Sequence, residues 1–119
     1  MIHIKLQHSS IVATLVDKGS AWSLEDGLLT GAWRASDMLR SLGSIMVLGK
    51  KLCEGDLYED LKEHVCQGLD FSVDPGQQEA NVCNAVTFGV AFNAGAAKFG
   101  PVIKQDDSAA ECVADECVE

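Results

Sequence analysis

The chain has 119 residues, of which 47% are hydrophobic and 23% charged, and this composition excludes a disordered protein. The net charge of −9 argues against direct binding to nucleic acid, because the phosphates would be repelled. We therefore expect one globular domain over residues 1–105, followed by an acidic and mobile tail over residues 106–119.

The N-terminal segment predicts a short β-hairpin. Ile2, Ile4 and Leu6 alternate with polar residues, as in a strand with one buried face. Residues 7–10 provide a polar turn, and the β-branched residues of 11–16 provide a second strand. The same residues lack the basic start and apolar run of a signal peptide, and no segment has the roughly 20 apolar residues of a membrane-spanning helix. We expect a protein that does not bind membranes.

A first amphipathic helix is expected to begin after Ser23, which has Asp26 three positions on, close to a capping box. It should end near Gly49, ahead of two lysines that suit a helix C-terminus. The apolar residues that recur at helical spacing between these limits are Leu28, Ala32, Ala35, Leu39, Leu42 and Met46.

A second helix is expected between Asp56 and Gly68. Asp56 with Glu59 forms a cap-like pair, and Gly68 is typical of the residue that follows a helix. Leu57, Leu61 and Val65 would form its buried stripe.

A third helix is expected to start at residues 74–77, where Asp74 would cap and Pro75 would occupy the first helical position. It should run to about Lys98, because a Gly-Pro pair follows. Its residues 82–99 are apolar on nearly every face, which is typical of a core helix or a subunit interface, and we expect both. The alternative is a strand over 85–92. The fold class predicted is α+β, mostly helical with about three helices and an N-terminal hairpin.

The cysteines predict no disulfide framework, because their number is odd and their spacing irregular. Free cysteines are common in reducing compartments, which favours a cytoplasmic location. No pair has the spacing of a structural zinc site, so neither a metal nor a cofactor is expected. The residues concerned are Cys53, Cys66, Cys83, Cys112 and Cys117.

No catalytic or nucleotide-binding motif is present. No cysteine has a local partner histidine, and no glycine-rich loop has the pattern of a phosphate cradle. We therefore expect no enzyme. A small histidine-dependent enzyme or ligand binder remains an alternative if His3, His8 and His64 converge in one pocket.

Acidic residues cluster in residues 54–79, where eight carboxylates accompany one lysine, whereas residues 1–53 are slightly basic. Such a cluster is commonly a solvated surface that keeps a protein soluble. A sharper interpretation is a mimic of a phosphate backbone that occupies a basic surface on a nucleic-acid-handling protein. The residues expected to bind this partner are Glu54, Asp56, Glu59, Asp60 and Glu63.

Two functional hypotheses follow. The first is a non-enzymatic acidic inhibitor of a basic protein surface, similar in general character to small inhibitors encoded by phages and other mobile elements, although no motif identifies a family. The second is a self-assembling structural or scaffold protein, a homo-oligomer held together by the apolar segment 82–99. The residues expected to mediate that self-association are Phe88, Phe92 and Phe99.

Overall fold

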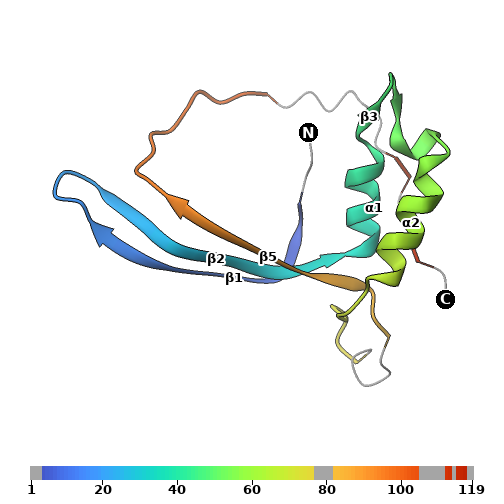
Figure 1. The fold of residues 1–119 in the computed structure, drawn as a ribbon, viewed down its shortest axis with the longest axis horizontal. Helices are drawn as coiled ribbons and strands as arrows, with labels where there is room; N and C mark the ends of the chain where they lie inside the picture. The colour runs from blue at the N-terminus through green and yellow to red at the C-terminus, as the bar shows by residue number, and fades with distance from the viewer. Residues whose placement is uncertain (1–3, 77–81, 105–111, 114, 118–119) are drawn as a thin grey trace.

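The computed structural model describes residues 4–76, 82–104, 112–113 and 115–117. These residues form two regions that lie end to end (Figure 1). One is a three-stranded antiparallel sheet with the strand order β1-β2-β5, and the other is a helical unit built from α1, α2 and a small hairpin.

Strands β1 (Leu6–Asp17) and β2 (Trp22–Arg34) form one long antiparallel hairpin. The predicted turn at residues 7–10 is wrong, because β1 continues through it with a β-bulge, where His8 adopts a φ of 49°. The actual turn lies at residues 18–21, and there the side chain of Asp17 accepts a hydrogen bond from the amide of Gly19.

Helix α1 (Ala35–Gly43) follows β2 directly. The helix predicted from Ser23 to Gly49 is therefore correct only in its second part. The first part contains Gly27 and Gly31, each of which weakens a helix by about 1 kcal/mol, and it pairs with a strand on both sides. Pairing with two neighbours outweighs the helical spacing of its apolar residues.

A small hairpin and a helical turn connect the two helices. Strands β3 (Met46–Val47) and β4 (Lys50–Lys51) flank a two-residue turn in which both Leu48 and Gly49 have positive φ angles. A 3-10 turn, η1 (Leu52–Glu54), precedes α2 (Leu57–Gln67), which confirms the second predicted helix.

The two helices pack on each other through a small core. Leu39 of α1 is completely buried, and Ala35 and Val65 are nearly so. Met38 and Leu61 add partly buried side chains to this cluster. Leu61 and Val65 of the predicted stripe of α2 thus face α1, whereas Leu57 is 61% exposed and the prediction is wrong for it.

Strand β5 (Ala85–Ala94) replaces the third predicted helix. It pairs antiparallel with β2 along its whole length. Asp74 does not cap a helix, because its carboxylate accepts hydrogen bonds from Arg34 and from Asn84 at 2.5 and 2.6 Å. Residues 77–81 of the predicted helix lie outside the described residues. The apolar side chains of 85–92 therefore follow the period of a strand, the alternative that the β-branched and aromatic residues also allowed.

The C-terminal segment is tied to the helical unit by two disulfides, Cys53–Cys112 and Cys66–Cys117. The expectation of unpaired cysteines is wrong for these four, and Cys83 alone is free. The expected mobile tail is also wrong for its described residues, since Cys112 is buried. Spacing along the chain could not reveal these pairs, because the partners are 59 and 51 residues apart.

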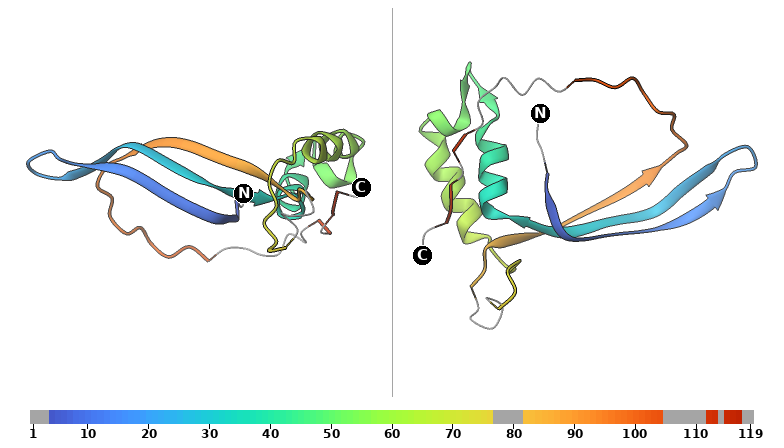
Figure 2. Two further views of the ribbon diagram at one scale, coloured as in Figure 1. Left: turned by 90° about the horizontal axis from the view of Figure 1, so that it is seen from below. Right: turned by 180° about the vertical axis from the view of Figure 1, so that it is seen from behind.

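The described chain is thus rich in strands with two α-helices, rather than mostly helical with three. It is also thin and elongated, measuring 54 × 41 × 21 Å, and Figure 2 shows the sheet projecting from the helical unit. Its radius of gyration is 17.9 Å. A compact chain of this length would have about 14 Å. Much of the sheet consequently has no second layer over it.

Candidate interaction surface

One face of the sheet, here called the apolar face, is apolar along its length. Residues paired directly across strands point to the same face, so the register assigns each side chain to one side. The larger apolar side chains on this face are Leu6, Ile11, Leu15, Trp22, Leu24, Leu29, Trp33, Val86, Phe88, Val90 and Phe92. Among the paired residues, Asp17 at the hairpin end is the one charge on it.

The opposite face, here called the mixed face, alternates apolar and polar residues. Among small residues it also carries two exposed aliphatic side chains, Val12 and Leu28. Its polar and charged residues are Gln7, Ser10, Thr14, Glu25, Thr30, Arg34 and Thr87. Near the helical unit it is covered by residues 70–74, with Val73 packed on Ala32 and Ala85. A sheet with one apolar and one polar face normally buries the apolar one.

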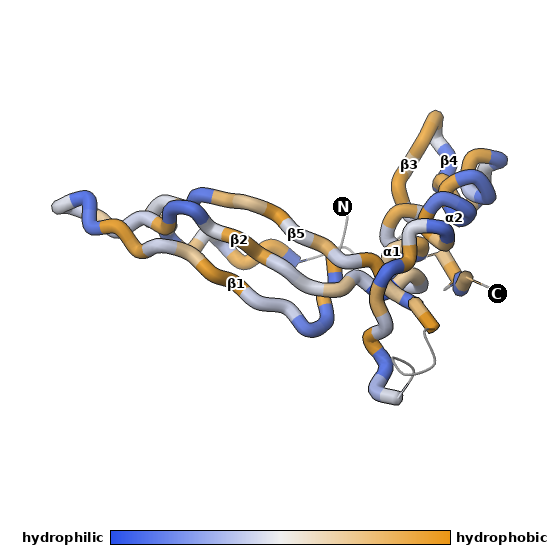
Figure 3. Tube along the Cα trace, turned by 60° about the horizontal axis from the view of Figure 1, so that its bottom comes forward, coloured by the Kyte–Doolittle hydropathy of each residue, from blue (hydrophilic) through white to orange (hydrophobic). Residues whose placement is uncertain are grey.

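The apolar face is instead open along β1, at the hairpin end and at Val90, whereas most of its other side chains are half-buried. The exposed fractions are 66% for Ile11, 60% for Leu15 and 56% for Trp22. The tube coloured by hydropathy shows apolar residues recurring along the strands of the projecting sheet (Figure 3). Only the end beside the helical unit is well packed, where Trp33 is buried and meets the ring of Phe88 edge to face.

Two local features keep the apolar side chains on one side. Phe92 lies over Gly27, where a Cβ atom would stand 2.7 Å from the ring, so only glycine leaves room for it. A β-bulge at Asp26, with a φ of 50°, adds a residue to β2 and keeps Leu24 on the same face as Leu15. The side chain of Asn93 accepts the amide hydrogen of Asp26 and holds the bulge in place.

The residues predicted for self-association fall in two places. Phe88 and Phe92 lie on the apolar face, although on a strand rather than a helix. Phe99 lies beyond the strand, in the segment 95–104, and its side chain is fully exposed. The structure therefore brings two of the three into one surface. The strand predicted over residues 11–16 lies within β1, but the sequence did not predict β2 or the surface that both strands extend.

The five acidic residues predicted to bind a partner all lie on η1, α2 and the short link between them, and all are exposed. Among described residues, none of the five takes part in an ion pair; the four ion pairs found there involve other acids. Glu54 accepts a hydrogen bond from the amide of Lys51, which fixes the start of the 3-10 turn. This surface lies on the helical unit, away from the projecting sheet (Figure 1).

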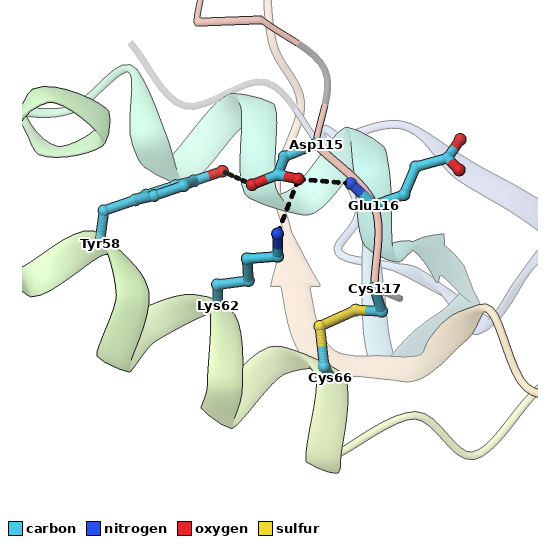
Figure 4. The surroundings of a disulfide bond; sticks show 6 residues. All are labelled: Tyr58, Lys62, Cys66, Asp115, Glu116 and Cys117. Carbon is cyan, nitrogen blue, oxygen red and sulfur yellow. Dashed lines mark hydrogen bonds and ion pairs between the residues drawn. A yellow bond between two sulfur atoms is a disulfide. The ribbon is translucent and has the colours of Figure 1, made fainter. Parts of the chain in front are cut away.

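A partly buried carboxylate, Asp115, fastens the C-terminal segment to α2 beside the Cys66–Cys117 disulfide (Figure 4). Asp115 accepts hydrogen bonds from Lys62 at 2.8 Å and from the hydroxyl of Tyr58 at 3.3 Å. The bond from Lys62 holds the pKa of Asp115 below its usual range. Burial, followed by the charge of Asp115, raises the pKa of Tyr58 to about 12, so its hydroxyl stays a donor at neutral pH.

The described histidines share no partner. His8 donates to the carbonyl of Val73 and its ring meets Phe71, whereas Nδ1 of His64 bonds to the carbonyl of Asp60 in its own helix. His3 lies outside the described residues. Within the described part of the chain, no group of His, Cys, Asp and Glu side chains has the arrangement of a metal site.

Comparisons with known proteins gave no match to a family model, to a curated protein or to a solved structure. In the described residues, no helix is both long and apolar enough to cross a membrane.

Proposed function

We propose that this protein is a self-assembling structural protein, in which the apolar face of one copy packs against the apolar face of a second copy. The observation that carries this proposal is the open, apolar face of a single-layer sheet. A sheet in water is stable when its apolar side is covered by another layer. Packing two such faces together produces a sandwich, in which the side chains of the two inner faces form the core.

A second copy fits this face better than a charged partner does. The face carries no charge except Asp17 at its end, so it offers nothing to a basic or acidic surface. Two identical faces related by a two-fold axis are complementary in chemistry by construction. A face about 40 Å long and 14 Å wide gives roughly 1,100 Å² of interface for two copies, close to the lower limit of a stable dimer.

The disulfides bear on where the assembly would form. Pairing of four of the five cysteines removes the support that free thiols gave to a cytoplasmic location. Structural disulfides persist in oxidising compartments. We therefore infer an oxidising environment for the assembled protein.

The test compares two lysine substitutions at neighbouring positions on opposite faces. Leu15 points to the apolar face and is opposite Leu24, whereas Thr14 points to the mixed face and is opposite Glu25. In the proposed assembly, Leu15→Lys buries an uncompensated charge, and Thr14→Lys does not. Molar mass measured by light scattering after gel filtration should be oligomeric for the wild type and for Thr14→Lys, and lower for Leu15→Lys.

Because Leu15 is exposed in the single chain, the chain with lysine at this position should remain folded. Circular dichroism of both variants checks this point. A monomeric wild type would overturn the proposal, and so would an unchanged mass for Leu15→Lys.

A second candidate function is the acidic inhibitor, favoured by the exposure of all five carboxylates on and beside α2. Reversing Glu59 and Asp60 to lysine should abolish capture of a basic, nucleic-acid-handling protein without unfolding the chain. Undiminished capture would contradict it. The self-assembly proposal is preferred because an open apolar face requires a cover, whereas an exposed acidic helix is stable in water.

A further inference from the structure

The outer edge of β5 divides into an occupied part and an open part. Near the helical unit, Ala85 exchanges backbone hydrogen bonds with Phe71, and the amide of Thr87 donates to the side chain of Asp70 at 2.7 Å. Outward-pointing backbone groups recur at every second residue of a strand. The next outward groups therefore belong to Gly89, Ala91 and Asn93, and no described residue pairs with their backbone on this side.

The open part of this edge lacks the features that normally prevent pairing between copies. Natural edges are protected by charged side chains, proline or bulges. Residues 85–97 contain no charged residue and no proline, and β5 itself runs without a bulge. The segment 95–104 leaves the plane of the sheet after β5 and does not cover the edge (Figure 2).

The other edge strand, β1, is protected at its two ends. It has a bulge at residues 7–10 and a charged residue at Asp17. Between them β1 is regular, because the register shift beside residues 12–14 comes from the extra residue Asp26 in β2. The open part of β5 has no such protection at either end.

We propose that β5 pairs antiparallel with β5 of a second copy, with Ala91 opposite its own counterpart. Because Ala85 and Thr87 are occupied, pairing is limited to about residues 88–94, and the centre of that stretch is Ala91. Ala91 lies on the mixed face, so a two-fold axis perpendicular to the sheet brings both apolar faces to the same side. The product is a six-stranded sheet with a continuous apolar face.

This inference deepens the proposed function and rests on it, because the wider sheet is what makes face-to-face packing strong. A six-stranded face doubles the interface between two layers to roughly 2,200 Å², which lies within the range of obligate oligomers. Two layers of two chains each give an assembly of four chains. Edge pairing and face packing are thus two separate contacts of one assembly.

The test is Ala91→Lys, with Thr14→Lys as the matched control. Both lysines would lie on the mixed face of an edge strand, but only the one at 91 would stand opposite its own copy, where like charges repel. Measured by light scattering, Ala91→Lys should have half the molar mass of the wild type, and Thr14→Lys should keep it. A double variant, Leu15→Lys with Ala91→Lys, should be a monomer.

A second measurement distinguishes the loss of edge pairing from misfolding of the variant. In the assembled wild type, hydrogen exchange at the amides of Gly89 and Ala91 should be slowed at least tenfold relative to the monomeric double variant, and circular dichroism should be unchanged. An unchanged mass for Ala91→Lys, or fast exchange at these amides in the wild type, would overturn edge pairing. The proposed function fails separately, when Leu15→Lys leaves the mass unchanged.

Discussion

The helical unit and the projecting sheet use opposite means to stay folded. The helical unit has a buried centre at Leu39, two disulfides and the Asp115 network, all within a single chain. The sheet has regular pairing along β1, β2 and β5, but no layer over most of its apolar face. A small core is commonly reinforced by disulfides, whereas an uncovered sheet is commonly completed by another chain.

This contrast concerns how the apolar residues are distributed between the core of the helical unit and the surface of the sheet. A chain with 47% hydrophobic residues has enough of them for a larger core than the one around Leu39. Eleven of the larger ones lie on the apolar face, where Ile11, Leu15, Trp22 and Val90 are exposed in one copy. In the proposed assembly, the helical unit is held together within one chain, whereas the sheet is covered by a second copy.

The largest expected effect is on the unfolding free energy of the helical unit. Removing one disulfide should lower it more than it lowers the stability of the sheet. Replacing Cys66 and Cys117 together by serine releases a connection across 51 residues. In the chain-entropy description, this costs about 4 kcal/mol of unfolding free energy. Denaturant unfolding should show a lower midpoint for the helical circular-dichroism signal. The fluorescence of Trp22, at the far end of the sheet, should change less.

The control is Cys83→Ser, because Cys83 is exposed and unpaired. It should change the unfolding free energy by less than about 0.5 kcal/mol. Equal loss of both signals in the double serine variant would show that the two regions unfold as one unit. That outcome would contradict the division of the molecule into two regions.

A smaller effect is expected on the pH dependence of the unfolding free energy. The folded-state pKa of Asp115 is lowered by Lys62, so the stabilisation it brings is complete above the unfolded-state pKa and is lost as pH falls through the lowered value. Stability of the wild type should therefore decline from about pH 4 downwards. Asp115→Asn should be less stable at neutral pH and should show a shallower decline.

Asp37→Asn provides the matched control, since Asp37 pairs with Arg40 on the surface of α1 at 4.0 Å. A surface pair of this kind is worth about 0.5 kcal/mol or less. If Asp115→Asn kept the same acid dependence as the wild type, another carboxylate would control the acid response. Asp74, whose pKa is lowered by Arg34, would then be the next residue to replace.

The sequence predicted the helical unit better than the sheet, for physical reasons. The stripe of Leu57, Leu61 and Val65 is local, so helix α2 was identified. The pairing of β2 with β5 is not local, since Arg34 and Ala85 are neighbours across the sheet and far apart in sequence. Helical spacing in residues 28–34 and the cap-like residues at 74–77 were outweighed by that pairing.

The candidate surface was anticipated only in part. The segment 82–99 was singled out because it is apolar throughout, and Phe88 and Phe92 do lie on the apolar face. The helical conformation predicted for this segment is wrong, because an apolar run does not distinguish a buried helix from a strand. The disulfide pairing could not be predicted from the sequence, because which cysteines meet depends on the fold.

The smallest expected effect lies at the tip of the β3–β4 hairpin. Leu48 has a φ of 51° and is completely exposed, so it adopts a strained conformation without burying its side chain. Asn followed by glycine is the preferred pair in this type of turn. Leu48→Asn should therefore raise the unfolding free energy by up to about 1 kcal/mol in thermal or denaturant unfolding.

Leu48→Ala keeps a Cβ atom in the same conformation, so it should give none of this gain, and it serves as the control. The helical unit holds this strained residue because the pairing of Met46 with Lys51 and the nearby Cys53–Cys112 disulfide fix both ends of the hairpin. If Leu48→Asn instead destabilised the protein, the leucine would have a partner in the assembled state. The helical unit would then share the dependence on a second copy that we assign to the sheet alone.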